Sequence, residues 1–301
     1  MSKTLQIGLI GLDTSHVSAF TKLLNDPDAE YHVPGGKVTV AYPGGSSDLE
    51  LSYSRVDGFT NELHEQYGIQ IVDSLEAVAE QSDAIMLESV DGRVHLNQFM
   101  QIAPFGKPVF IDKPFALSTA EADSIFELAT QYNVPLMSCS SLRYAEGLVQ
   151  VLSQQENGPI YGADFYGPME IQPTQPGFFW YGIHTVEMLF AAMGAGCEHV
   201  TVTTNDKQDV AVGVWNDGRI GTIRGNRHGN RLFGGLIHRD KATQEVDVYA
   251  HRKPYYASLL EIALAMFRTG KPPIDRNETR QIIRFIEAAN ESRVTGKMVN
   301  L

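Results

Sequence analysis

A lysine and a histidine stand where a side chain could act on an oxygen-bearing substrate. Lys113 follows the apolar run 108–111 and precedes a proline, so we expect its ammonium at the carboxyl end of a strand, where open α/β sheets bind ligands. His184 opens a helical pattern, and the positive end of a helix dipole disfavours the imidazolium form. A neutral imidazole can accept a hydroxyl proton while an ammonium stabilises the developing alkoxide. We therefore predict Lys113 and His184 as catalytic residues that oxidise a secondary alcohol. The structural alternatives are a solvated surface lysine and a hydrogen-bonded histidine at a domain interface.

Five further residues could contact a substrate in the same crevice. Glu187 lies one helical turn after His184 and could orient its ring. The other four offer polar contacts to substrate oxygens or an apolar wall against a sugar ring, and they are Arg143, Tyr144, Trp180 and Tyr181. For these four, an ordinary structural role is the favoured interpretation. His16 and His95 are interpreted as residues of local helix starts, and no paired spacing of histidines supports a metal site.

The turn after the first strand predicts a phosphate-binding site with defects. A dinucleotide site places a glycine turn between a strand and a helix, with the spacing G-x-G-x-x-G, but here the spacing gives Gly11-x-Asp13-x-x-His16. Hydroxyl groups and helix amides could replace the missing glycines, so the predicted cofactor-binding residues of this turn are Gly11, Leu12, Asp13, Thr14 and Ser15. Lys113 is also predicted to contact the cofactor. Asp13, Thr14 and Ser15 are also favoured helix N-caps, so a capped helix without a ligand is an equal alternative.

The second strand ends without the acid that binds the ribose of NAD. Tyr42 or Pro43 takes that position, and glycines and serines follow. The hydroxyl groups of Ser46 and Ser47 could seat the extra phosphate of NADP, with Arg55 as a counter-charge. We therefore expect a cofactor of the NAD(P) type, with NADP favoured over NAD. An ordinary polar turn is the alternative.

The pattern of the chain predicts two domains that would position these residues. In residues 1–118 short apolar runs alternate with helical periods, which indicates a Rossmann-type, doubly wound parallel sheet. Residues 43–60 break this pattern and are expected to form an exposed excursion. Residues 119–301 contain consecutive strand-like runs, and Asn216-Asp217-Gly218 indicates a hairpin. We predict an α+β domain there, built on a largely antiparallel open sheet, with the last helix packing back on the first domain.

Several motifs, in order, resemble those of the Gfo/Idh/MocA family, named for glucose–fructose oxidoreductase and inositol dehydrogenase. The main anchors are Asp112-Lys113-Pro114 and Gly182-x-His184-x-x-Glu187, which match the family's E/D-K-P and G-x-H-x-x-D. The resemblance implies hydride transfer between NAD(P) and a hydroxyl-bearing carbon of a sugar-like or polyol substrate, with Lys113 and His184 in the catalytic positions. Two departures are Trp180, where the family has an acid, and residues 88–91, where it has a threonine–proline pair.

Composition limits the partners and the compartment. The formal net charge is −12 and no apolar run is long enough to cross a membrane, so we expect neither nucleic acid nor membrane as a partner. The first residues enter a strand pattern without an export signal, and Cys139 and Cys197 lack metal-ligand spacing, which fits a cytoplasmic protein. An exposed face of the second sheet would favour a homodimer or homotetramer.

Two other functions remain open from the residues alone. A regulatory protein that binds a ligand on the same fold would explain Asp13, His16, Trp180 and the missing ribose acid. An enzyme without hydride turnover would use a divalent cation at the carboxyl edge of the sheet, where Asp13, Glu88, Asp91 and Asp112 are all expected. Acids at strand ends are also common caps, so the leading prediction includes no metal.

Overall fold

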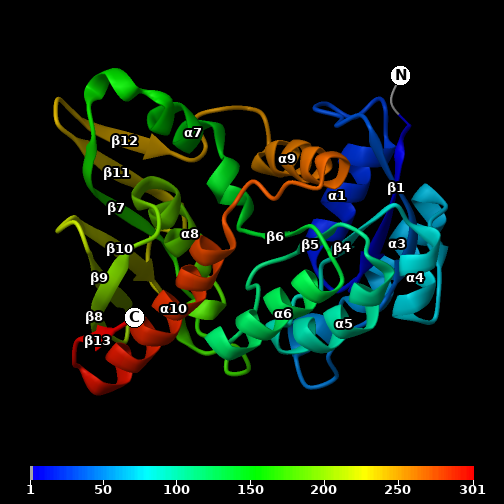
Figure 1. The fold of residues 1–301 in the computed structure, drawn as a ribbon, viewed down its shortest axis with the longest axis horizontal. Coiled ribbons are helices and arrows are strands. Elements are labelled where there is room, and N and C mark those ends of the chain that lie inside the picture. The colour runs from blue at the N-terminus through cyan, green and yellow to red at the C-terminus, as the bar shows by residue number, and fades with distance from the viewer. Residues whose placement is uncertain (1–2) are drawn as a thin grey trace. The chain divides into compact units, whose positions relative to one another are not determined.

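The computed structural model describes residues 3–301, which divide into two compact units (Figure 1). The first unit contains residues up to 116, then 120–139 and 256–275, and the second contains 117–119, 140–255 and 276–301. The expected boundary at residue 118 would therefore separate the first sheet from its last strand. The helix that returns to the first unit is α9 (Tyr255–Thr269), whereas the last helix, α10 (Arg276–Thr295), belongs to the second unit.

A six-stranded parallel sheet forms the centre of the first unit, in the order β3-β2-β1-β4-β5-β6. This is the strand order of a Rossmann-type sheet, and it confirms the predicted fold class. The strand order reverses between β1 and β4, so the loops after these two strands flank the usual ligand crevice. The strands are β1 (Leu5–Ile10), β2 (Gly36–Tyr42), β3 (Gln70–Ile71), β4 (Ala84–Leu87), β5 (Val109–Ile111) and β6 (Leu136–Ser138).

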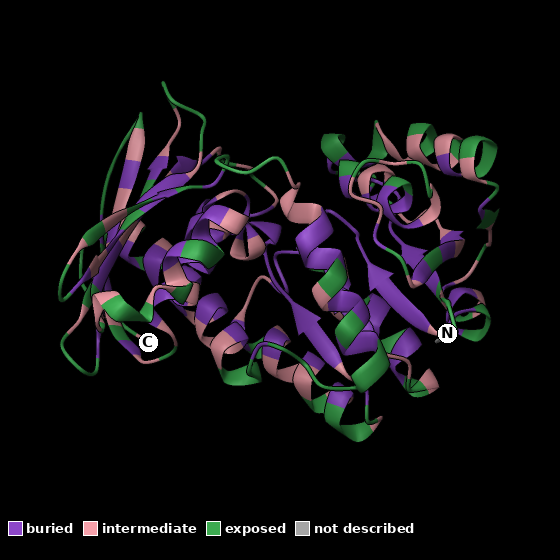
Figure 2. Ribbon diagram, turned by 90° about the horizontal axis from the view of Figure 1, so that it is seen from above, coloured by how far each residue is buried: buried purple, intermediate pink, exposed green. Residues whose placement is uncertain are grey.

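Burial explains why these strands were visible in the sequence. Every residue of β4, β5 and β6 is buried, because helices cover a parallel sheet on both faces. Figure 2 shows central strands in the purple of buried residues. The connecting helices are α1 (Ser15–Asn25), α2 (Glu50–Tyr53), α3 (Val56–Tyr67), α4 (Leu75–Gln81), α5 (His95–Ile102) and α6 (Thr119–Gln131). Short 3-10 turns lie at Gly92–Val94 and Ala103–Phe105.

The prediction of an exposed excursion over residues 43–60 was wrong, because helices α2 and α3 occupy its second half. Val56, Phe59, Leu63 and Tyr67 recur at helical spacing, and α3 packs with α1. The helix ends at Gly68, which has a φ of 65° and forms a left-handed C-cap. The prediction rested on the glycines, serines and acids of this segment, and Ser52, Ser54 and Gly58 lie within the helices or directly at their ends.

The second unit is built on a seven-stranded sheet in the order β12-β11-β7-β10-β9-β8-β13. Every neighbouring pair except β7 and β10 is antiparallel, which confirms the largely antiparallel sheet. Helix α8 packs on β7 and β10, and α10 packs on β8. The strands are β7 (Ile160–Pro168), β8 (Cys197–Asn205), β9 (Gln208–Trp215), β10 (Ile220–Asn226), β11 (Gly234–Arg239), β12 (Thr243–Asp247) and β13 (Val299–Asn300).

Parts of the second unit differ from the prediction. The strand-like runs of the sequence do not include β11, and the last of these runs, at residues 246–250, overlaps only the end of β12. Helices α7 (Glu146–Ser153) and α8 (Gly182–Met193) complete the unit, with short 3-10 turns at Ser141–Tyr144, Gln155–Asn157 and Gly177–Phe179. The hairpin between β9 and β10 is confirmed, and Gly218 in its turn has a φ of 85°.

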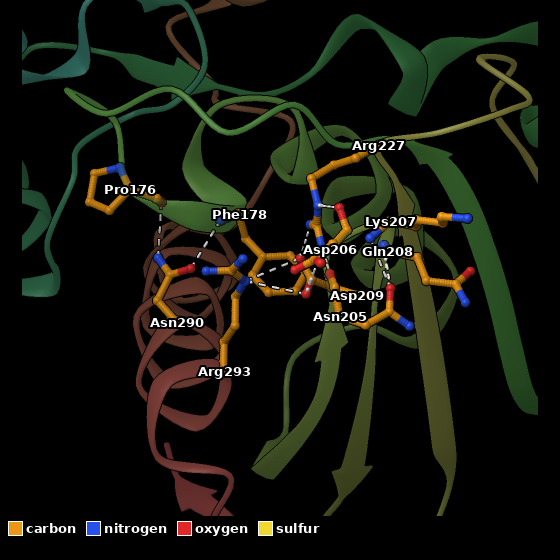
Figure 3. A network of polar contacts seen from close by, with 10 residues as sticks. All are labelled: Pro176, Phe178, Asn205, Asp206, Lys207, Gln208, Asp209, Arg227, Asn290 and Arg293. Carbon is orange, nitrogen blue, oxygen red and sulfur yellow. Dashed lines mark hydrogen bonds and ion pairs between the residues drawn. The ribbon is translucent and has the colours of Figure 1, made fainter.

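Helix α10 is joined to the sheet by buried ionic contacts (Figure 3). The Asp209 carboxylate on β9 is fully buried and accepts hydrogen bonds from Arg227 and from Nε of Arg293 at 3.2 Å. Asn290, one turn earlier on the helix, accepts from the Phe178 amide at 3.0 Å. These contacts fix α10, and through it the segment that leads into α8. Among residues 3–301, no helix has the length and hydropathy of a membrane span.

Candidate functional site

Three loops meet at the carboxyl edge of the parallel sheet, after β1, β4 and β5. Gly11 has a φ of 86°, and a Cβ placed there would lie 2.3 Å from Ser89 Oγ and 2.4 Å from the Ser89 amide nitrogen. The turn after β1 and the segment after β4 therefore touch at a position that only glycine fits. His95 joins the other two loops, because Nε2 lies 2.8 Å from the Ser89 carbonyl and Nδ1 lies 3.0 Å from the Pro114 carbonyl. Its role is larger than the helix start that we expected.

The start of α1 partly fits a dinucleotide pyrophosphate. Thr14 caps the helix and accepts from the His16 amide, whereas the amides of Thr14 and Ser15 donate no hydrogen bond to any group of residues 3–301. Unpaired amides at a helix start are the donors that a bound phosphate uses. The Leu12 amide differs, since it donates to the Pro43 carbonyl at 2.7 Å.

The Asp13 side chain, which stands where a glycine is usual, is held inside the unit. Its Oδ1 accepts from the Val90 amide at 2.9 Å and its Oδ2 from the Ser52 hydroxyl at 2.5 Å. Burial raises the pKa of Asp13 above its ordinary value, against the effect of these hydrogen bonds. A carboxyl group that is bonded on both oxygens, and less readily ionised, places less negative charge beside a phosphate than the sequence suggested.

The two serines predicted for the cofactor have different surroundings. Ser46 is buried, its amide donates to Ser52 Oγ, and its hydroxyl lies at the Asp91 carboxylate. Ser47 is exposed. Arg55, the suggested counter-charge, donates from Nε to the Leu51 carbonyl and is half-buried. Of the two hydroxyl groups, that of Ser47 is therefore the one open to a ligand.

Lys113 lies directly after β5, as predicted, and its side chain is only 11% exposed. Its Nζ is 4.0 Å from Asp112 Oδ2, and the Lys113–Pro114 peptide bond is cis. With its carbonyl bound by His95, Pro114 fixes the backbone next to the lysine. This is a positioned, largely buried ammonium rather than a solvated surface lysine.

A cluster that the sequence analysis did not assemble surrounds Asp112. His16, at the position of the third motif glycine, places Nδ1 2.8 Å from Asp112 Oδ2 and 3.7 Å from Glu88 Oε2. Burial acts against the imidazolium, but the Asp112 carboxylate outweighs it and raises the pKa of His16 to about 9. Burial raises the pKa of Glu88 to about 7, while the charges of His16 and Lys113 overcome burial and hold the pKa of Asp112 well below its usual range.

The four acids predicted at this edge thus separate into two pairs. Asp13 accepts hydrogen bonds from Ser52 and the Val90 amide. Asp91 forms a salt bridge with Arg93 at 2.7 Å, so the pKa of Asp91 is lowered despite its burial. Glu88 and Asp112 instead face His16. The sequence placed all four acids at strand ends. The signal that could have predicted the cluster is His16, which stands at a glycine position of the motif beside Glu88 and Asp112.

His184 lies in the first turn of α8 in the second unit, as predicted. Its Nδ1 is 2.6 Å from the Ser140 hydroxyl, and its ring stacks edge-on against Tyr181 and Phe233, with centroids 5.7 Å and 5.3 Å away. Ser140, which the sequence analysis missed, is therefore the hydroxyl that orients the ring.

Glu187, which we expected to orient His184, instead accepts from Arg143 at 3.1 Å. Arg143 also binds Glu278 at the start of α10, so both predicted polar contacts belong to one buried ionic group. Burial raises the pKa of Glu187 to about 7, even though Arg143 favours its charged form. Trp180 is only 7% exposed, while Tyr181 and Tyr144 are half-buried.

Comparisons with known proteins agree with this fold. Residues 7–139 match a family model described as "Oxidoreductase family, NAD-binding Rossmann fold". No curated protein matches the chain. Among solved structures, a myo-inositol 2-dehydrogenase from Lactobacillus plantarum has a TM-score of 0.82 at 15% identity, covering 99% of this chain and 100% of that one.

Two further structures are similar along their whole length. A probable dehydrogenase from Thermotoga maritima has a TM-score of 0.77 at 18% identity, with 98% of each chain covered. An oxidoreductase from Agrobacterium radiobacter, solved with NAD+, L-tartaric acid and magnesium, has a TM-score of 0.75 at 16% identity, covering 99% of this chain and 98% of that one. At these identities the likeness concerns the fold of both units.

Proposed function

Because its residues 7–139 match the model of the Gfo/Idh/MocA oxidoreductase family, we propose that this protein is an NAD(P)-dependent dehydrogenase acting on a CH–OH group of a sugar-like or polyol substrate. The observation that supports it most is the edge of the parallel sheet. There the unpaired amides of Thr14 and Ser15 and the buried ammonium of Lys113 belong to neighbouring loops of one unit. These groups suit the phosphates of a dinucleotide and the oxygen of its substrate.

In the proposed reaction, Lys113 and His184 act on the same hydroxyl group. When bound, the nicotinamide ring supplies the acceptor for the hydride that leaves the carbinol carbon. His184 takes the hydroxyl proton on Nε2, while Ser140 holds Nδ1 and with it the orientation of the ring. The Lys113 ammonium hydrogen-bonds the oxygen and stabilises its negative charge as the C–H bond breaks. The alcohol loses its hydroxyl proton to His184 and a hydride to the cofactor, which together make a two-electron oxidation to a ketone.

Arg143 and Glu187 take a supporting part in this proposal. Their salt bridge links the segment that carries Ser140 to helix α8, which carries His184. We propose that Tyr144, Trp180 and Tyr181 face the substrate ring. Truncation of Tyr181, the half-buried neighbour of His184, should raise KM for the substrate more than it lowers kcat.

The cofactor preference is part of the same proposal. The family model is described as NAD-binding, and we propose that this chain also accepts NADP and prefers it. No acid follows β2, and the exposed Ser47 and the half-buried Arg55 lie on the segment that follows. The Ser46 hydroxyl is bonded to Asp91, so Ser46 would hold the shape of this segment rather than contact the phosphate.

Calorimetric titration with NAD+, NADH, NADP+ and NADPH tests the cofactor, and a panel of inositols, hexoses and sugar alcohols then tests turnover. We expect saturable binding of at least one reduced cofactor, and a loss of kcat of about 10²- to 10⁴-fold in Lys113→Ala and His184→Ala with cofactor binding retained in His184→Ala. Absence of binding to all four cofactors at millimolar concentration would refute the proposal. Binding without turnover on the whole panel would instead favour a regulatory, ligand-binding role.

We also propose a cytoplasmic homo-oligomer. On one face of the second sheet, Ile220 is 52% exposed and Leu236 is 40% exposed, next to the half-buried Val212 and Val214. β-branched and aliphatic side chains on an open sheet face are typical of a subunit interface. Cys139 and Cys197 are buried and form no disulfide in residues 3–301, which fits a reducing compartment. Analytical ultracentrifugation of the protein and of Ile220→Lys measures the oligomeric state, and a wild-type monomer at micromolar concentration would contradict this part.

A further inference from the structure

The cluster of His16, Glu88 and Asp112 has the spacing of a metal site. One potential ligand atom from each residue lies within 4.8 Å of the other two, and the closest approach is 2.8 Å between His16 Nδ1 and Asp112 Oδ2. Ligands about 2.1 Å from a common cation, at tetrahedral or octahedral angles, lie about 3.0 to 3.4 Å from one another. The separations in the cluster bracket these values, so small side-chain rotations would bring the three atoms onto one ion.

The Glu88 carboxylate is buried and lacks hydrogen-bond partners. Glu88 is 0% exposed, and both its carboxylate oxygens are without a hydrogen bond in residues 3–301. Asp112 Oδ2 and His16 Nδ1 already form an ionic contact at 2.8 Å. Buried polar atoms without partners are rare, and an ion is one of their ordinary explanations. Glu88 is thus a buried carboxylate without a hydrogen bond, 3.7 Å from the His16 ring nitrogen and close to a second carboxylate.

Neighbouring groups fix the imidazole in place. The His16 ring stacks on Phe20 with centroids 5.5 Å apart, and the edge of Tyr256 contacts it at 5.1 Å. The three residues come from the first turn of α1 and from the ends of β4 and β5, which are rigid elements of one unit. A preorganised set of this kind loses little side-chain freedom when it binds an ion.

We propose that His16, Glu88 and Asp112 form a binding site for a divalent transition-metal ion, of which Zn²⁺ and Mn²⁺ are the best candidates. Once the ion has displaced the proton of His16, two carboxylates and a neutral imidazole carry a formal charge of −2, which a divalent cation neutralises. Imidazole favours Zn²⁺ and other transition metals over Mg²⁺, while carboxylates suit Mn²⁺. Three protein ligands leave at least one coordination position for water or a substrate oxygen, as in catalytic rather than structural zinc sites.

The nearby ammonium is the main competitor of this cation. Lys113 Nζ lies 4.0 Å from Asp112 Oδ2 and already supplies one positive charge. The Glu88 oxygens receive no hydrogen bond in residues 3–301. Once the ion displaces the His16 proton, the two carboxylates outnumber the one ammonium, and the proposal depends on that displacement.

Titration of the chelator-treated, full-length protein with ZnCl₂, MnCl₂ and MgCl₂ tests the site. We expect one ion of Zn²⁺ or Mn²⁺ per chain with a Kd in the micromolar range or below, and weaker binding of Mg²⁺. Glu88→Gln should bind that ion at least about tenfold more weakly, because a charged ligand is lost. Asp91→Asn is the matched control, since Asp91 leaves the end of the same strand but is paired with Arg93, and it should retain the affinity.

The wild-type titration decides the question even if a variant fails to fold. No saturable binding of any of the three ions up to millimolar concentration would overturn the proposal, as would equal affinities of wild type and a folded Glu88→Gln. His16→Gln provides a second ligand variant, and the manganese EPR spectrum of the loaded protein should change in it. The inference does not depend on the proposed dehydrogenase: cofactor binding can fail while the ion binds, and the reverse can also occur.

Discussion

Replacement of Glu187 by glutamine should remove a large pH dependence from the stability of the second unit. Glu187 is only 3% exposed, and burial raises its pKa from the ordinary 4.5 to about 7 despite the nearby Arg143. Below pH 4.5 the carboxyl group is protonated in the folded and the unfolded chain, so its contribution to stability is fully present. As the pH rises towards 7 the unfolded chain ionises first, and this contribution is lost.

The size of the effect follows from the same two values. A pKa raised from 4.5 to about 7 corresponds to a free-energy change of about 3 kcal/mol between acidic and neutral pH. Glutamine resembles the protonated acid and does not titrate. The free energy of unfolding of wild type minus that of Glu187→Gln should therefore fall by about 3 kcal/mol between about pH 4 and about pH 8.

Urea unfolding followed by tryptophan fluorescence measures this difference. The chain has two tryptophans, Trp180 and Trp215, and both lie in the unit that contains Glu187. Glu198→Gln on β8 is the control, because its carboxylate is exposed in the same unit. A difference between wild type and Glu187→Gln that stays constant across this pH range would refute the reasoning, since it would mean that the carboxyl group is hydrated in the folded protein.

Three other substitutions test the packing inside the two units. Asp209→Asn should destabilise the second unit by about 3 kcal/mol in urea unfolding, because it removes the buried carboxylate that neutralises Arg227 and Arg293. Gly11→Ala should lower stability by about 2 kcal/mol or more and weaken cofactor binding, because its φ is positive and its Cβ would overlap Ser89. His95→Phe should cost about 2 kcal/mol in thermal unfolding, since the ring nitrogens lie against the Ser89 and Pro114 carbonyls and the N–H they supply is lost.

Matched variants separate these effects from general sensitivity to mutation. Asp217→Asn removes a carboxylate from an exposed pair with Arg219 and should change stability far less than Asp209→Asn. Gly58→Ala adds a methyl group in helix α3, where nothing lies within 4 Å of the new atom, and should be neutral or stabilising. Equal losses in Gly11→Ala and Gly58→Ala would contradict the close approach of Ser89.

The parts of the fold that the sequence predicted are those determined by local pattern. Strands such as β4 and β5 are short, uninterrupted apolar runs because helices cover both faces of a parallel sheet. The hairpin between β9 and β10 follows from Asn216-Asp217-Gly218, whose glycine takes a positive φ. In both cases the chemistry that creates the element lies within a few neighbouring residues.

Strand β11 was missed because its stability comes from its neighbours in space. It begins with Gly234 and Gly235, which have low strand propensity, and these glycines are required by contacts from another strand. A Cβ on Gly235 would lie 2.4 Å from the Phe165 ring of β7. No periodicity in the sequence records a close approach between residues about seventy positions apart, although a glycine pair within a strand-like run is a weak signal of one.

In the candidate site, too, the sequence predicted where the acids lie but not which groups they bind. The end of each strand predicted that Asp13, Glu88, Asp91 and Asp112 would reach one edge of the sheet, but which acid is bonded depends on loops from elsewhere in the chain. Asp13 accepts hydrogen bonds from Ser52 and the Val90 amide, and Asp91 forms a salt bridge with Arg93. These partners could be identified only after the helices of the 43–67 segment and the turn after β4 were in place.

His16 changes how the defective glycine motif should be interpreted. A glycine at this position serves the packing of helix on strand, and its loss was counted against a cofactor. In the structure the histidine turns towards Glu88 and Asp112, while the amides of Thr14 and Ser15 at the same helix start stay unpaired. The substitution therefore adds a cation-binding group without using the donors that a phosphate needs. Cofactor binding and metal binding then become separable properties of one sheet edge, and a protein that binds a dinucleotide with and without Zn²⁺ at similar affinity would be the expected result.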